Sequence, residues 1–275
     1  RILIKPNCGR MAEPDSGINT SPAAVAAILD YLSEHTRAEL LVGESPIRGV
    51  KTLPALEKAG IADVARERDV TLADLDAEKP VRINLGENRL LKTLKICRLA
   101  RAVDYIISVP VMKTHMHTVV TLSFKNMKGI IYGKEKVRLH QLSETGDHET
   151  FKPLDIALAQ LGDVLRPDLC VIDGSTGLEG FGPSSGTPIR SDLAVAGHNP
   201  VTTDAAAARL MGIEPRSIPH LVLAEDMGYG PIQPPSDVDP PEYEKYAVPF
   251  ELPPEKIDIH YPDRKSTRLN SSHYS

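Results

Sequence analysis

The strongest constraint on the fold is the alternation of short, β-rich apolar runs with helical stretches along most of the chain. The runs expected to be buried strands are residues 1–5, 38–42, 104–109, 169–172 and 193–196. Two dipeptides, Ser21-Pro22 and Asn199-Pro200, place an N-cap residue before proline at the first helical position. The pattern predicts an α/β fold: a mostly parallel sheet flanked by helices, with a basic loop region after the central strand 104–109.

Three segments are expected from the composition along the chain. Residues 1–230 carry the α/β pattern, and residues 231–262 form a Pro-rich extended segment without a core pattern. Residues 263–275 resemble the in-frame translation of a sequencing adapter and are excluded from the fold. Because the chain opens at Arg1 without Met, it reads as a fragment.

Composition narrows the function classes. The formal net charge of -5 argues against a nucleic-acid partner. No apolar run approaches the roughly 20 residues that cross a bilayer, so no membrane partner is expected. The three widely spaced cysteines favour a reducing, cytoplasmic compartment, and without a CxxC pair an iron–sulfur cluster within this chain is not expected.

Polar clusters follow several of the predicted strands. They are Lys5-Pro6-Asn7, Gly43-Glu44-Ser45, Lys113-Thr114-His115, Asp173-Gly174 and Gly197-His198-Asn199. Because open α/β sheets bind ligands at the carboxyl ends of their strands, these clusters predict a shared rim. The alternative is that each is an ordinary polar loop at a strand end.

Cations are concentrated after the central strand. Between Lys113 and Arg138 there are six lysines and arginines against Glu135 alone. Such a field attracts phosphate or carboxylate, and Lys125, Asn126 and Lys128 would contact the anion. A solvated basic face is the alternative reading.

Histidines supply a second chemistry. His115 and His117 would share one face of a strand, and with His140 they could ligate a divalent metal. His115 could instead act as an acid–base group or an anion contact.

Carboxylates near the expected rim complete the candidates. Residues 173–186 are expected to form a glycine-rich loop, in which Asp173 and Glu179 could act as bases, metal ligands or hydroxyl acceptors. Asp204 lies in the first turn of the helix that Asn199 opens. The free N–H groups of that turn could bind an anion, or the turn could only cap itself.

Several segments taken in order resemble the domain-of-unknown-function family 362 over about residues 1–230. They include Ile4-Lys5-Pro6-Asn7, Val42-Gly43-Glu44-Ser45, Val109-Pro110-Val111-Met112-Lys113-Thr114-His115, Leu122-Ser123-Phe124-Lys125-Asn126-Met127-Lys128-Gly129, Glu179-Gly180-Phe181-Gly182-Pro183 and Ala196-Gly197-His198-Asn199-Pro200-Val201. Some members of that family are fused to ferredoxin-like modules with cysteine-ligated clusters. The resemblance therefore implies redox work with a ferredoxin-like module or partner, although this chain lacks the cluster cysteines.

The leading hypothesis is an enzyme that acts on a small anionic metabolite. Its catalytic candidates are His115, Lys113, Asp173 and Glu179. Its ligand-binding candidates are Lys5, Asn7, Glu44, Ser45, Lys125, Asn126, Lys128 and Asp204. The alternatives are a metal- or iron–sulfur-associated redox protein that uses His115, His117 and His140, and a ligand-binding module without turnover.

Overall fold

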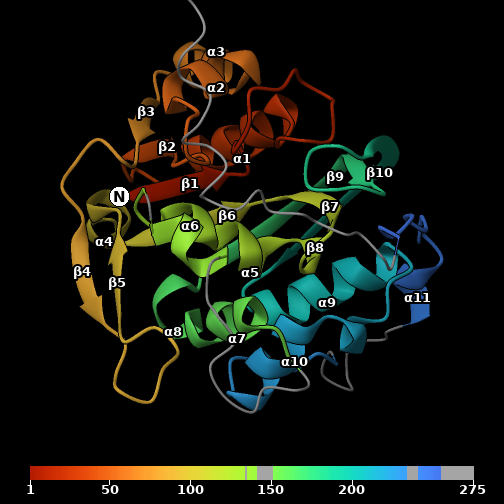
Figure 1. Cartoon of the computed structure of the whole chain (residues 1–275). Coiled ribbons are helices and arrows are strands. Elements are labelled where there is room, and N and C mark those ends of the chain that lie inside the picture. Colours follow the sequence, from red (N-terminus) through yellow and green to blue (C-terminus); the bar gives the residue numbers. More distant parts are fainter. Residues whose placement is uncertain (134, 141–150, 234–240, 255–275) are drawn as a thin grey trace, which may run out of the picture.

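The computed structural model describes residues 1–133, 135–140, 151–233 and 241–254. It contains a large sheet between two helical layers and a separate two-stranded hairpin (Figure 1). The strands are β1 (Ile2–Pro6), β2 (Leu40–Glu44), β3 (Thr71–Asp74), β4 (Val81–Asn84), β5 (Thr93–Ile96), β6 (Tyr105–Val109), β7 (Val111–His115), β8 (Val119–Thr121), β9 (Leu169–Glu179) and β10 (Thr187–Gly197). The helices are α1 (Pro22–His35), α2 (Thr52–Lys58), α3 (Ile61–Glu67), α4 (Arg98–Ala102), α5 (Ser123–Asn126), α6 (Glu135–His140), α7 (Pro153–Gln160), α8 (Gly162–Leu165), α9 (Pro200–Leu210), α10 (Pro219–Asp226) and α11 (Pro241–Glu244), with 3₁₀ turns η1 (Met127–Ile130) and η2 (Pro215–Ser217).

The large sheet has the order β3-β2-β1-β6-β9-β7-β8, with β10 paired to β9. Strands β3, β2, β1, β6, β9 and β7 are parallel to their neighbours, whereas β8 and β10 are antiparallel additions. The mostly parallel sheet flanked by helices and the central place of β6 confirm the predicted fold class. The carboxyl ends of β1, β2 and β7 consequently share one edge of the sheet.

Both faces of the sheet are buried, as the nearly continuous apolar strands predict. On β1 the side chains alternate: Ile4 packs with Val25 and Leu29 of α1, while Leu3 packs in a second cluster with Leu154 and Leu158 of α7. In Figure 1, α1 to α3 lie above the sheet and α7 to α10 below it. A third cluster joins the β7 end of the sheet to α9 and α10.

Both predicted helix starts are confirmed. The Ser21 hydroxyl accepts a hydrogen bond from Ala23 N at 3.2 Å and opens α1. The Asn199 side chain accepts from Val201 N at 2.9 Å and Thr202 N at 3.1 Å and opens α9. The latter turn therefore caps itself, the simpler of the two readings.

Two segments differ from the sequence expectation. The predicted glycine-rich loop is a strand over its first half, because β9 runs to Glu179 and pairs with β10 as far as Thr187. The basic segment after β6 is more regular than a loop, since it forms β7, β8, α5, η1 and α6. The two segments also pair with each other, β7 with β9, and because these strands are far apart in sequence, local composition did not reveal the pairing.

The described part of the Pro-rich segment packs against the α/β unit. Val248 N donates to Leu210 O, Phe250 N donates to Met211 O, and Ile232 is buried. These contacts continue the core beyond residue 230. Within the described residues, no helix has the length and apolar character needed to span a membrane.

Candidate functional site

A cavity of about 570 Å³ opens at the shared edge of the sheet, where β1, β2 and β7 end. Its volume suits a small ligand. Ten of the sequence-predicted site residues line it: Lys5, Asn7, Glu44, Ser45, Lys113, His115, His117, Lys125, Asn126 and Lys128. Parallel strands thus bring together residues more than a hundred positions apart.

A buried ion pair joins β1 to β2 in the cavity wall. Lys5 Nζ lies 2.8 Å from Glu44 Oε2 and donates to Asn126 Oδ1 at 3.0 Å and to Pro6 O at 2.8 Å. Glu44 also accepts from Cys8 N at 3.0 Å and from Ser45 N at 2.8 Å. Lys5 and Glu44 therefore neutralise each other and anchor α5 to the sheet.

Lysines in the cavity wall are held in an environment that disfavours their charge. Lys113 is buried on β7 and donates to Ile18 O at 2.7 Å. Burial, with Arg10 as the next cause, lowers the pKa of Lys113 to about 7. Lys125 lies half-buried on α5, and burial followed by the charge of Lys113 lowers its pKa to about 7.

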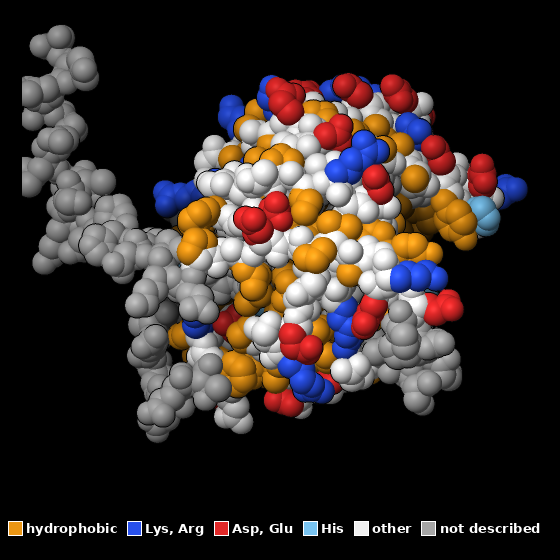
Figure 2. Space-filling view, turned by 90° about the vertical axis from the view of Figure 1, so that its right-hand side faces the viewer, with side chains coloured by type: hydrophobic (Ala, Val, Ile, Leu, Met, Phe, Trp, Pro, Cys, Tyr) orange, Lys and Arg blue, Asp and Glu red, His pale blue; other side chains and the backbone are white. Residues whose placement is uncertain are grey.

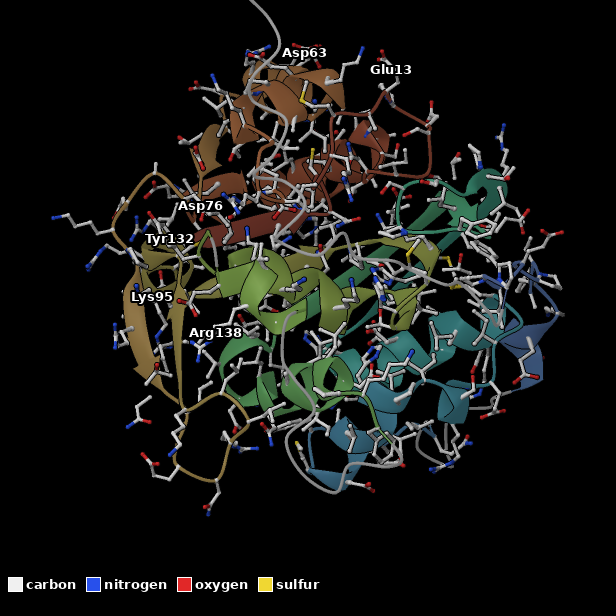
Figure 3. The ribbon with its side chains drawn as sticks, in the orientation of Figure 1. Glu13, Asp63, Asp76, Lys95, Tyr132 and Arg138 are labelled. Carbon is white, nitrogen blue, oxygen red and sulfur yellow. The ribbon has the colours of Figure 1, made fainter. Side chains whose placement is uncertain are left out.

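Burial also lowers the pKa of lysines on η1 and α6. Burial, with Lys125 and Lys136 as further causes, lowers the pKa of Lys128 well below its usual value. Lys136 is hydrogen-bonded to Ser45 O and Oγ, and it donates to Pro46 O at 3.0 Å. The Ser45 hydroxyl donates to Asp76 Oδ2 at 2.5 Å, so the structure already engages this predicted ligand contact. In Figure 3, Asp76 and Tyr132 lie on the side of the molecule that carries hairpin β4–β5.

His115, the last residue of β7, faces the cavity beside His117. His115 Nδ1 accepts a hydrogen bond from His117 N at 3.0 Å, so the neutral ring carries its proton on Nε2. The two imidazole rings are tilted by 50°, with centroids 5.7 Å apart. Burial, with Lys125 next, lowers the pKa of His117.

The charge of the cavity wall is strongly unbalanced. Among its described residues Glu44 is the one carboxylate, against seven cationic side chains: Lys5, Arg10, Arg48, Lys113, Lys125, Lys128 and Lys136. On the face shown in Figure 2, by contrast, acidic and basic side chains are interspersed. The cavity wall thus carries a local surplus of cations, and a negatively charged ligand would be attracted there.

Two predicted carboxylates do not reach the cavity. Asp173 accepts from Ser21 N at 2.7 Å, Ser175 N at 3.0 Å and Ser175 Oγ at 2.6 Å, and so ties β9 to the start of α1. Glu179 accepts from Glu251 N at 2.9 Å. Their oxygens serve the fold because β9 continues as a strand past Asp173.

Asp204 also lies outside the cavity wall but acts on it indirectly. Its two carboxylate oxygens accept from Ser123 N and Phe124 N, each at 2.8 Å, at the first turn of α5. Burial raises the pKa of Asp204 to about 7, against the opposing effect of these two hydrogen bonds. Asp204 is therefore a positioning residue for the helix that carries Lys125 and Asn126.

The last predicted cluster, Gly197-His198-Asn199, lies at the opposite edge of the sheet. Gly197 pairs with Cys170 near the start of β9, because β10 is antiparallel. His198 Nδ1 accordingly contacts Asp168 O at 3.1 Å. The predicted shared rim is wrong for this cluster.

For the metal hypothesis, the structure brings His115 and His117 together, whereas the side chain of His140 lies outside the described residues. In the part of the chain that the structure describes, no group of three or more His, Cys, Asp or Glu side chains could hold a metal ion.

Sequence reasoning missed several cavity residues. Arg10 and Arg48 lie a few positions beyond the Lys5-Asn7 and Glu44-Ser45 clusters. Their closeness in sequence to these clusters could have identified them as cavity residues. In the glycine-rich segment it is Phe181, Pro183, Ser184 and Ser185 that line the cavity, rather than the carboxylates.

Comparison with known proteins places the chain in a family. Residues 2–209 match the family described as "Domain of unknown function (DUF362)", and the chain belongs to it, which confirms the resemblance found in the sequence. It is 26% identical over 232 residues to the thylakoid-associated protein sll1697 of Synechocystis sp., covering 84% of this chain and 69% of that protein.

A solved structure is also among the matches. The lactate racemase apoprotein from Thermoanaerobacterium thermosaccharolyticum superposes with a TM-score of 0.49 at 15% identity. The match covers 72% of this chain, which spans 45% of the length of the racemase chain.

Proposed function

We propose that this DUF362 protein is an enzyme that binds a small anionic metabolite, through a phosphate or carboxylate group, in the cavity at the end of the sheet. The observation that carries the proposal is the charge of the cavity wall, where seven cationic side chains face one carboxylate. Because Glu44 is already paired with Lys5, its charge is not available to balance the other cations of the wall.

Lys113, Lys125 and Lys128 would supply the attraction. Burial lowers the pKa of all three, with Arg10 as the next cause for Lys113, Lys113 for Lys125 and Lys125 for Lys128, so keeping these ammonium groups charged costs free energy in the ligand-free protein. An anion between them would offset this repulsion. Asn126 and Asn7, linked by a 3.3 Å hydrogen bond, would contribute uncharged contacts.

His115 is proposed as the proton-transfer group. It faces the cavity, and because its Nδ1 accepts from the His117 amide, Nε2 is the nitrogen left to act on a ligand: it donates a hydrogen bond in the neutral ring and gives up a proton in the imidazolium. A His115→Gln variant should retain anion binding and lose turnover by about 10²–10⁴-fold. This role is tested by comparing product formation in a metabolite mixture between the wild type and the His115→Gln variant.

The binding claim is tested by thermal stability against a panel of phosphorylated and carboxylated metabolites. A ligand at a hundred times its Kd adds about 2.7 kcal/mol to the free energy of unfolding. This corresponds to roughly 2–4 °C for each kcal/mol in a chain of this size. Lys113→Met and Lys125→Met should abolish the rise, whereas Lys92→Met, which removes an exposed lysine, should keep it. If every anion leaves the melting temperature unchanged, the proposal fails.

Metal binding is a second candidate, favoured by the adjacency of the His115 and His117 rings in the cavity wall. Elemental analysis of the purified protein, with a His115→Gln, His117→Gln variant as control, tests it.

A cytoplasmic location is part of the main proposal, because the three cysteines are free and buried, as in a reducing compartment.

A further inference from the structure

Lys125 differs from the three buried lysines of the cavity wall in what its amine contacts. Lys5 is paired with Glu44, Lys113 donates to Ile18 O, and Lys136 donates to the Ser45–Pro46 backbone. Lys125 has no hydrogen bond or ion pair with another residue among those the structure describes, and it is partly open to the cavity. Its Nζ is therefore positioned to meet a ligand.

The surroundings of Lys125 keep part of its amine uncharged near neutral pH. Burial and the neighbouring Lys113 lower its pKa to about 7, against the opposing effect of Asp155. At pH ~7 the unprotonated fraction is about a thousand times that of a lysine with an ordinary pKa near 10.4. Only an unprotonated amine has the lone pair needed for attack on carbon, and a desolvated lysine beside a second cation meets this requirement.

We propose that Lys125 is a nucleophile that forms an imine with an anionic ligand bearing a carbonyl group, such as a 2-oxo acid or an aldehyde phosphate. The inference rests on the proposed function, because Lys113 and Lys128 must bind the carboxylate or phosphate of the same molecule. Holding that group would keep the carbonyl carbon close to Lys125 Nζ. The cavity of about 570 Å³ is large enough for a molecule of this class.

The reaction balances without an oxidant or reductant. The Nζ lone pair forms a bond to the carbonyl carbon, and the C=O π electrons move to oxygen, which takes up a proton. After loss of a proton from nitrogen the product is a neutral carbinolamine. Proton donation to its hydroxyl group then releases water as the nitrogen lone pair forms the C=N bond. His115, which lines the same cavity, would donate that proton from Nε2 in its imidazolium form, and the resulting neutral ring would recover it from the iminium.

Reductive trapping tests the inference directly. The full chain is incubated at pH ~7 with sodium cyanoborohydride and either pyruvate or glycolaldehyde phosphate, and adducts are mapped by mass spectrometry of peptides. We expect one reduced adduct on Lys125 with at least one of the two probes. Lactate or glycerol phosphate, which match the probes in charge but lack the carbonyl, should compete with the corresponding probe and reduce labelling.

Matched variants separate nucleophilicity from charge. Lys125→Arg keeps the positive charge and should lose the adduct, whereas Lys95→Arg on hairpin β4–β5, away from the cavity, should label like the wild type (Figure 3). Equal labelling of several lysines, labelling that persists in Lys125→Arg, or no adduct on Lys125 with either probe would overturn the inference. Because mapping is done on the wild-type chain, the result does not depend on the variant folding.

Failure of the imine and failure of the proposed function give different results. If lactate or glycerol phosphate raises the melting temperature but neither carbonyl probe is trapped, the imine is refuted and anion binding stands. If no anion binds and no adduct forms, both proposals fall.

Discussion

Lys5 Nζ lies 2.8 Å from Glu44 Oε2 in the cavity wall, and both side chains are buried. The pair links β1 to β2 and, through Asn126, fixes α5 against the sheet. Because the charge of Lys5 is neutralised inside the protein, the lysines of β7, α5 and η1 are the ones that an anion would meet.

Removing one member of this pair should be costly. Lys5→Met leaves the Glu44 carboxylate buried without its cation, which we expect to reduce the free energy of unfolding by about 3–5 kcal/mol. The double variant Lys5→Met, Glu44→Gln removes the uncompensated charge and should recover part of the loss. Urea unfolding of the three proteins measures both effects, and a loss under about 1 kcal/mol in Lys5→Met would contradict the role of the pair.

Gly129 is expected to tolerate no side chain. A Cβ atom there would lie 2.5 Å from Glu44 Oε1 and 2.6 Å from Lys5 Nζ, so alanine must displace the ion pair. We expect Gly129→Ala to lower the free energy of unfolding by about 1–3 kcal/mol, the range seen for overpacking. Gly86→Ala is not a suitable control. Although nothing lies within 4 Å of an added Cβ there, the φ of Gly86 is +98°, so alanine would strain the backbone. Gly9→Ala is the better control, since its nearest contact is 4.0 Å away.

Asp204 should influence the site through α5. Asp204→Asn replaces one acceptor oxygen with an NH₂ group facing a buried backbone N–H, which should cost about 1–3 kcal/mol. The variant should also weaken anion binding, because the turn that carries Lys125 loses its anchor. Chemical unfolding and anion titration of the same variant check the two effects.

The raised pKa of Asp204 makes the free energy of unfolding depend on pH. Its pKa in the folded protein is about 7, above the unfolded value near 3.8, so the folded state holds more protons between these pH values. The contribution of Asp204 to the free energy of unfolding therefore falls as pH rises from about 4 to about 7. The stability difference between the wild type and Asp204→Asn, followed across this window, should decrease; a constant difference would contradict the assignment.

Anion binding should weaken as pH rises above about 7. Lys113 and Lys125 have pKa values of about 7 without ligand, and a bound anion raises them, so binding takes up protons. Affinity should fall by up to roughly tenfold per pH unit for each lysine until its ligand-bound pKa is reached. A carboxylate probe is suitable, because its own charge is constant above pH ~6. An affinity that stays level from pH ~7 to ~9 would show that these lysines do not hold the anion.

Local signals made much of this architecture predictable. Ser21 and Asn199 cap the helices they were expected to open, because capping depends on a few neighbouring residues. Lys5, Glu44 and Lys113 line one cavity because the parallel strands β1, β2 and β7 end at the same edge of the sheet, which follows from fold class alone.

The remaining site could not be read from local sequence, since it depends on pairing between distant strands. Whether the glycines after Asp173 form a loop or a strand depends on pairing with β7, far earlier in the chain, as well as with β10, and the antiparallel direction of β10 sends His198 to the far edge. Interactions inside the fold likewise decide that Asp173 and Glu179 bond to backbone amides while Arg10 and Arg48 line the cavity.

Calorimetric titration of the panel anion that most raises the melting temperature tests the central claim most directly. We predict saturable binding at one site with net proton uptake at pH ~7.5, seen as a dependence of the heat on the ionisation enthalpy of the buffer. Lys113→Met, Lys125→Met should lose the binding, and Lys92→Met should retain it. Unchanged affinity in the double variant, or binding without proton uptake, would contradict the assignment of this cavity as the anion site.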